Sequence, residues 1–205
     1  RALEAADLGI SWYVLARPGN PNDRIRLDQS LLERMQRAGC IKIGFGIETV
    51  SPAVARAMRR PAGNEYVMQL ARWIDELGML SKAFLIIGHP AEDAHYYEYL
   101  REYIDQLQVD EIRISFLTPF PGTPLWHQHK DWIPSREGYA AFTTFRPLIP
   151  HPIFGASDLE AIRARLLSGF YGSPTYRARI QRKVRMFPEL QESFQSYIIY
   201  LFLQL

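Results

Sequence analysis

The chain contains four apolar runs, and stretches with helical periodicity separate them. The runs at 12–16, 41–47 and 83–87 are almost continuously apolar, and the fourth, from Ile112, partly alternates with polar residues. Continuous apolar runs are typical of parallel strands covered on both faces. We therefore expect three buried strands, with the fourth near an open edge of the sheet.

The segments between the runs repeat apolar residues every three or four positions, as amphipathic helices do. Such stripes lie over 31–38, 67–77 and 97–107, and Ser51-Pro52 predicts a helix N-cap followed by proline in the first turn. Strands alternating with helices make right-handed βαβ units, which wind into a barrel or an open sheet with helices outside. The pattern thus predicts an α/β fold, a partial (βα) barrel, over 1–126.

The character of the chain changes after residue 126. Residues 127–156 are rich in proline and aromatic residues and are interpreted as a connector wrapping a surface. Residues 157–205 are expected to be a helical extension: Ser157 and Glu160 have the spacing of a capping box, and Ser173-Pro174 begins a second helix. Its basic run over 177–185 is interpreted as a solvated helix face.

Both ends look like cuts through a longer protein. Residues 1–9 are interpreted as the last turns of a helix closed by Gly9, and the sequence stops within an apolar run at 197–205. That run is too short to span a bilayer and is expected to be buried against a continuation of the chain.

Composition narrows the possible partners. The 205 residues are 47% apolar and 22% charged, and 24 basic residues against 22 acidic ones give a net charge of +2. This balance favours neither nucleic acid nor an anionic membrane as a partner. One cysteine, Cys40, excludes an intrachain disulfide, fits a reducing compartment and, with no targeting signal visible, indicates a cytoplasmic protein. Following Gly39 at a helix–strand joint, Cys40 is interpreted as a small buried thiol.

Candidate site residues follow the ends of the runs, where α/β folds place their active sites. Glu48 ends a buried run, and a carboxylate there is costly unless a donor or cation meets it. Gly44 and Gly46 would leave room for a ligand near the backbone. Arg17, at the end of the previous run, would either bind a ligand carboxylate or pair with Glu48. A capping role for Glu48 is the structural alternative.

Two further turns follow the third and fourth runs. Gly88 begins a Gly-His-Pro-Ala-Glu turn, in which we interpret Glu92 as a helix cap. The string from Thr118 to Pro124 contains three prolines and a glycine, which fix a rigid turn just past a strand. His127 and His129 have a metal-ligand spacing but no evident third ligand, and no metal site is predicted.

Three segments resemble the later strands of the radical S-adenosylmethionine (SAM) barrel. They are Gly-Ile-Glu at 46–48, Ile-Gly-His-Pro-Ala-Glu at 87–92 and Thr-Pro-Phe-Pro-Gly-Thr-Pro at 118–124. The resemblance is strong over 5–126 and is greatest to the cobalamin-dependent branch. The family binds its [4Fe–4S] cluster through Cys-x3-Cys-x2-Cys, and this chain has only Cys40. The cluster ligands are therefore expected upstream of this chain.

The resemblance also implies roles for residues. Glu48, beside Gly46, would accept a hydrogen bond from the methionine amino group, and Arg17 would hold its carboxylate. Gly88 would shape the adenosine pocket, and the backbone at Thr118 and Pro119 would face the adenine edge. The catalytic residues are not identified.

The implied enzyme uses S-adenosylmethionine, an iron–sulfur cluster and, in the branch most resembled, cobalamin. It would methylate a small-molecule substrate or perform related C–H chemistry, with an electron donor such as flavodoxin or ferredoxin. Two alternatives stay open: a cobalamin-independent cyclase, oxidase or methylthiotransferase, and a binding or scaffold domain that has no cluster.

Overall fold

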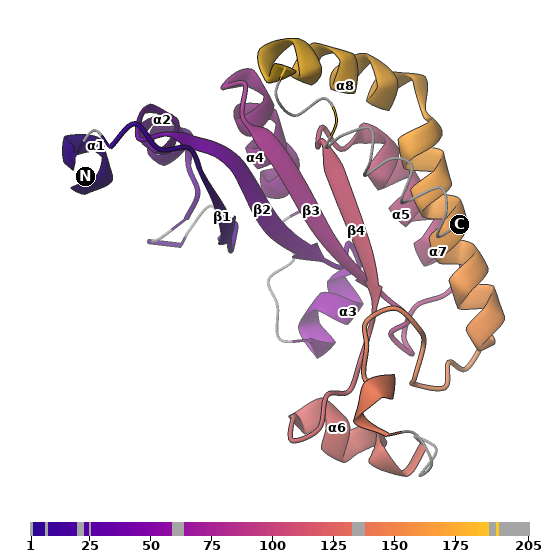
Figure 1. The fold of residues 1–205 in the computed structure, drawn as a ribbon. Coiled ribbons are helices and arrows are strands. Elements are labelled where there is room, and N and C mark those ends of the chain that lie inside the picture. Colours follow the sequence, from indigo (N-terminus) through magenta and orange to yellow (C-terminus); the bar gives the residue numbers. More distant parts are fainter. Residues whose placement is uncertain are drawn as a thin grey trace.

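The fold, seen in a computed structural model, is a four-stranded parallel sheet covered by helices on one side (Figure 1). The structure describes residues 2–6, 8–19, 23–24, 26–58, 64–132, 138–188 and 192. The strands, in the spatial order β1-β2-β3-β4, are β1 (Trp12–Ala16), β2 (Cys40–Glu48), β3 (Leu80–Ile87) and β4 (Glu111–Phe116). The helices are α1 (Ala2–Ala6), α2 (Gln29–Arg37), α3 (Pro52–Ala57), α4 (Asn64–Glu76), α5 (Ala94–Gln106), α6 (Pro124–His129), α7 (Ala156–Gly172) and α8 (Pro174–Met186), with 3-10 turns at Lys130–Trp132 and Tyr139–Ala141.

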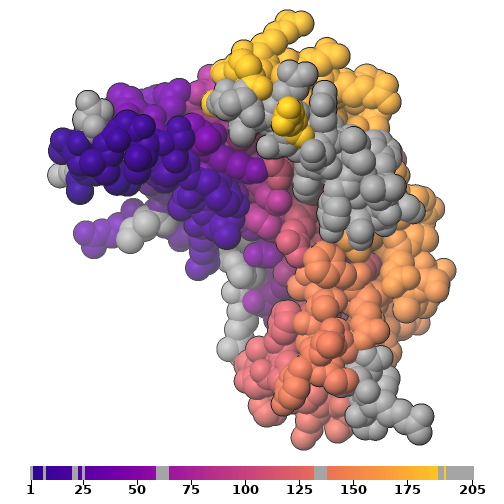
Figure 2. All heavy atoms as spheres, viewed as in Figure 1, coloured from indigo at the N-terminus to yellow at the C-terminus, as the bar shows by residue number. Residues whose placement is uncertain are grey.

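The core lies between the sheet and the helical layer. Alternate strand residues, such as Phe45, Leu85 and Ile114, are buried against α2, α4, α5 and α7. The other strand positions are only half-buried or exposed in β1 and β3. The prediction of strands covered on both faces is therefore wrong for the described residues: helices cover one face, and the second face is concave and polar in places. Figure 2 shows a bent molecule, with the N-terminal segments (indigo) and the α6 region (salmon) at the two ends of the bend.

Local sequence explains where the helices begin. Ser51 accepts a hydrogen bond from the Val54 N–H, and Ser173 accepts one from Tyr176, each followed by proline as predicted. The predicted capping box at 157–160 is displaced: α7 begins at Ala156, and the Asp158 carboxylate accepts the Gly155 N–H at 2.9 Å. The acidic side chain at the third helical position holds the backbone of the residue before the helix.

Side chains and a loop cover the outer edge of β4, the terminal strand. The Tyr171 hydroxyl donates to the Ile112 carbonyl at 2.9 Å and accepts from the Ile112 N–H at 3.0 Å. Farther along, the Phe116 N–H donates to the Thr144 carbonyl at 2.9 Å. β4 is therefore at the edge of the sheet, as predicted, but its exposed ladder is closed by α7 and the 143–145 segment.

Helix α8 is anchored to the sheet by a buried cation. Lys183 is fully buried and donates to the Met79 carbonyl, with the Asp75 carboxylate at 3.1 Å and Asp110 at 3.8 Å. Arg179 donates to the Val109 carbonyl from the same helix. The interpretation of 177–185 as a solvated face is thus wrong at Lys183, because the helix turns this side chain toward the amino ends of the strands.

The division at residues 126 and 156 stays a prediction. Helix α6 spans the first boundary, and α7 and α8 contribute Leu159, Phe170 and Ile180 to the same core as the sheet. The apolar run at 197–205 lies outside the described residues. Among the helices in the described ranges, no membrane-spanning candidate meets the requirements of length and hydropathy.

Candidate functional site

The candidate residues meet at the carboxyl edge of the sheet. The strands are parallel, so Arg17, Glu48, Gly88 and Thr118 all lie at or just beyond the same edge. Figure 1 shows α3 next to the arrowheads of the strands and α6 farther out, beyond the end of β4. The sequence prediction that these four positions share one end of a parallel sheet is confirmed. That they share one cavity, and their ligand contacts, stay predictions.

Glu48 occupies a strained turn. Its φ is +66°, and in the described part of the chain it is the only non-glycine residue with positive φ. The Thr49 N–H donates to the Ile47 carbonyl at 2.9 Å, so Glu48 is the central residue of a three-residue turn. The β2–β3 register shifts between Gly46 and Glu48, which marks a bulge. A side chain that holds this conformation is a candidate functional residue.

Contacts on both sides fix this turn. The Thr49 hydroxyl lies 3.2 Å from the Tyr96 hydroxyl of α5 and accepts the Ser51 N–H at 3.2 Å. A Cβ placed on Gly46 would overlap the Glu48 carboxylate. Gly46 therefore makes space for the Glu48 side chain rather than for a ligand directly.

Gly44 differs from the sequence interpretation in a similar way. Its missing side chain leaves space that Leu15, Tyr13 and Phe84 fill, since a Cβ would lie 2.6 Å from Leu15 Cδ2 and 2.7 Å from Tyr13 Oη. Arg17 follows the pair Ala16–Phe45 and so lies beside β2 near Gly46. It is exposed, and no hydrogen bond or ion pair joins it to another described residue.

The turn after β3 is built around a buried carboxyl group. Glu92 is 2% exposed, and its Oε2 accepts the Gly88 N–H and the Tyr97 hydroxyl, both at 2.7 Å. Asp93, rather than Glu92, is the N-cap of α5, so the capping interpretation of Glu92 is wrong. Burial raises the pKa of Glu92 to about 7, although its two donors oppose that shift.

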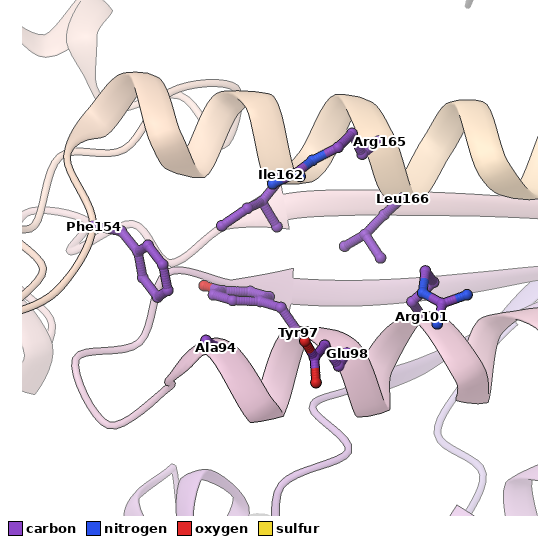
Figure 3. Close-up of a pocket in the computed structure, with 8 residues that line it drawn as sticks. All are labelled: Ala94, Tyr97, Glu98, Arg101, Phe154, Ile162, Arg165 and Leu166. Atoms are coloured by element: carbon purple, nitrogen blue, oxygen red, sulfur yellow. The ribbon is translucent and has the colours of Figure 1, made fainter.

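Tyr97 connects this turn to the helical layer. Figure 3 shows its ring facing Phe154, with Ile162 and Leu166 of α7 pointing toward α5. These residues line a cavity of about 270 Å³ between α5 and α7. Helix α7 therefore packs near Tyr97, whose hydroxyl is hydrogen-bonded to the same Glu92 carboxylate that accepts the Gly88 N–H.

The Thr118–Pro124 string is a sequence of tight turns. The Thr118 hydroxyl lies 3.0 Å from the carbonyl oxygens of Phe116 and Thr143, so its side chain is engaged in the fold. The Thr123 N–H donates to the Phe120 carbonyl, and Gly122 at the turn has a φ of +83°. Thr123 then caps α6 by accepting the Trp126 N–H at 3.2 Å. The role of Thr118 and Pro119 toward adenine stays a prediction, and for Thr118 it would fall to the backbone.

A larger cavity, of about 810 Å³, lies at the carboxyl edge. Residues next to the candidate positions line it: His89 and Pro90 follow Gly88, and Leu117 precedes Thr118. The end of α3, at Ala57 and Met58, and the 123–129 segment complete the described wall. A volume of this size is typical of small-molecule sites.

Sequence reasoning missed an ionic group on the concave face. Glu111 of β4 pairs with Lys42 of β2 and with Lys82 of β3, the second at 2.9 Å. The signal was present, because these are charged residues inside otherwise apolar runs. Six residues of strand separate Lys42 from Glu48, about 20 Å, so this group lies near the opposite end of the sheet.

The described donors do not fit an iron–sulfur cluster. Cys40 is 2% exposed, its thiol donates to the Lys42 carbonyl at 3.5 Å, and burial raises its pKa, so the thiolate form that a cluster needs is disfavoured. The interpretation of Cys40 as a structural thiol is confirmed. For S-adenosylmethionine the carboxyl edge is chemically suitable, because the Glu48 carboxylate can accept from an amino group and Arg17 is an exposed cation.

Comparison with known proteins decides the family. The family model described as the radical SAM superfamily matches residues 7–125, more than half of the chain. This chain belongs to the radical SAM superfamily. The resemblance seen in the three segments is thereby confirmed. The predicted fold class, α/β with later strands of a radical SAM barrel followed by helices, is confirmed as well.

Individual proteins are similar to this chain at low identity. An uncharacterized methyltransferase, PH0819 of Pyrococcus horikoshii, is 23% identical over 173 residues, which are 84% of this chain and 36% of PH0819. Coproporphyrinogen III oxidase (HemN) of Escherichia coli aligns with a TM-score of 0.55 at 13% identity, over 79% of this chain and 32% of HemN. The methyltransferase TsrM of Kitasatospora setae, solved with cobalamin and a [4Fe–4S] cluster, aligns with a TM-score of 0.50 at 18% identity, over 77% of this chain and 30% of TsrM. The chain therefore spans about a third of the length of these proteins.

Proposed function

We propose that this chain is the S-adenosylmethionine- and substrate-binding part of a radical SAM methyltransferase that uses cobalamin. Family membership supports the chemistry, and the similarity to PH0819 and TsrM favours methyl transfer. The observation that carries the proposal is Glu48, a carboxylate held in a strained turn at the carboxyl edge of the sheet.

The residues of this chain would bind and orient the cofactor. The Glu48 carboxylate would accept a hydrogen bond from the methionine amino group, and Arg17 would pair with its carboxylate. Glu92 would hold the Gly88 turn, and the 118–124 turns would stiffen the adjacent wall. Bound beside a reduced cluster, S-adenosylmethionine supplies the radical that removes a hydrogen atom from a substrate.

The test uses the full-length protein, anaerobically loaded with iron and sulfide. We expect one S-adenosylmethionine to bind per chain, 5′-deoxyadenosine to form with dithionite, and cobalamin absorbance to copurify or titrate. Binding and cleavage without cobalamin would favour the cobalamin-independent alternatives. Failure to bind S-adenosylmethionine with the cluster in place would contradict the proposal, and a full-length protein that takes up no cluster would favour the scaffold alternative.

A further inference from the structure

The 810 Å³ cavity is lined by residues to which no cofactor contact has been assigned above. Its described wall comes from α3, from the turn after β3, from the end of β4 and from α6. It lies next to Gly88 and Thr118, at the edge where the cofactor is proposed to bind. This position is where a second reactant would meet that cofactor.

Most of the described wall is apolar. Met58 of α3, Pro90 of the β3 turn, Leu117 after β4 and Leu125 of α6 face the same space, so apolar surface contributes from four segments. None of the described lining residues is Asp, Glu, Lys or Arg. A charged ligand group would lose its hydration here without meeting an opposite charge from those residues.

The polar side chains of the described wall are the imidazoles of His89 and His129, the amide of Gln128 and the hydroxyl of Thr123. His89 Nδ1 accepts the Ala91 N–H at 3.1 Å, so Nδ1 carries no hydrogen and the neutral ring has its N–H at Nε2. Burial lowers the pKa of His89, and His129 nearby acts in the same direction. The ring is therefore a neutral donor at physiological pH, suited to an acceptor oxygen.

We propose that this cavity binds the substrate, and that the substrate is an uncharged, largely apolar molecule with a carbonyl or hydroxyl oxygen that accepts the hydrogen of His89 Nε2. This inference rests on the proposed function, because it places the substrate beside the S-adenosylmethionine site. It adds a substrate class that family membership does not give.

Two fluorescent probes of similar size test the chemistry with the full-length, cluster-loaded protein. Prodan is a neutral naphthyl ketone, and ANS is an anionic naphthalenesulfonate. We expect prodan to bind saturably with a blue-shifted emission and ANS to bind at least tenfold more weakly. Equal or tighter binding of ANS, or no saturable prodan binding, would overturn the inference.

Variants locate the probe and separate the two proposals. Leu125→Trp should narrow the cavity and weaken prodan binding, whereas Leu3→Trp on exposed α1 should leave it unchanged. His89→Leu should weaken prodan about fivefold, the size of one neutral hydrogen bond, and His89→Gln should recover part of the loss.

The dissociation constant for S-adenosylmethionine should stay the same in Leu125→Trp. If it rises together with that of prodan, the cavity belongs to the cofactor and the inference fails, while the proposed function stands. If wild-type protein binds prodan but not S-adenosylmethionine, the proposed function is the one that fails.

Discussion

Glu48 has an unfavourable backbone conformation. For a residue with a side chain, a left-handed conformation costs about 1–2 kcal/mol, and glycine would remove that cost. The presence of a carboxylate at this strained position is the reason to test Glu48 for binding rather than for stability.

Glu48→Ala in the full-length, cluster-loaded enzyme should weaken S-adenosylmethionine by about 1.5–3 kcal/mol, the value of a hydrogen bond to a charged group. Calorimetric titration should then give a dissociation constant about tenfold higher or more. Glu98→Ala, at an exposed position of α5, is the matched control and should not change it. An unchanged constant in folded Glu48→Ala would return Glu48 to a structural role.

Glu48→Gly should be more stable than Glu48→Ala by about 1 kcal/mol, because only glycine adopts a φ of +66° without steric cost. The comparison isolates the backbone, since neither variant carries the carboxylate. Urea midpoints of the two variants measure the difference. Equal midpoints would show that the turn relaxes when the side chain is removed.

Glu92 should make stability depend on pH. Its pKa is raised from 4.5 to about 7 in the fold, so the folded state binds more protons than the unfolded state between these values. The stabilisation is complete below about pH 4.5 and is lost as the pH rises through about 7, by up to about 3 kcal/mol.

Glu92→Gln removes the titrating group but keeps an acceptor for the Gly88 N–H. Urea midpoints at pH 5 and pH 8 should differ less in this variant than in the wild type. The same fall in both proteins would assign the pH dependence to other groups.

At the scale of elements, α8 depends on one buried lysine. Lys183→Met would leave Asp110 buried beside Asp75 without its nearest cation, and losing one partner of a buried ion pair costs about 3–5 kcal/mol. Arg177→Met, on an exposed position of the same helix, should change stability by less than about 0.5 kcal/mol.

Hydrogen exchange of peptides from α8 measures the effect locally. We expect faster exchange over 174–186 in Lys183→Met and wild-type exchange in Arg177→Met. Similar exchange in both variants would mean that apolar packing by Tyr176 and Ile180 is sufficient to hold the helix.

The elements could be predicted because each depends on a local pattern. The run at 12–16 became β1, and Ser51 and Ser173 cap helices because their hydroxyls reach the backbone within one turn. The features that sequence reasoning missed depend on tertiary contacts. Lys183 is buried only because α8 crosses near Asp75 and Asp110, and nothing near it in sequence reports those partners.

The same distinction applies to the site. The four positions at the carboxyl edge followed from parallel topology, which alternating strands and helices predict. The burial of Glu92 required the positions of Gly88 and Tyr97, and the positive φ of Glu48 required a bulge against β3. These are details of register and packing, which periodicity does not encode.

At the scale of the whole molecule, β1 is the edge of the sheet at which association with other chains is expected. Tyr13 and Leu15 are 47% and 64% exposed on the terminal strand. Residues 1–205 expressed alone should therefore associate or stay partly molten, since exposed apolar strands at a sheet edge promote association. They should also bind no iron, because Cys40 is the only thiol.

Size-exclusion chromatography and iron analysis after anaerobic reconstitution test both expectations. Leu15→Lys should reduce association, because it places a charge on the exposed strand, while Leu3→Lys on α1 is the matched control. A monodisperse wild-type monomer would contradict the first expectation. A stoichiometric cluster would contradict the second.

The two hydrogen bonds of the Tyr171 hydroxyl determine at which edge a further strand can join the sheet. Tyr171 occupies the donor and the acceptor of Ile112 on the outer side of β4, where another strand would have to pair. A further strand can therefore extend this sheet only at β1, whether it comes from the same polypeptide or from another copy. Tyr171 is in this sense a terminator of strand addition, supplied by a helix rather than by a charged or bulged edge.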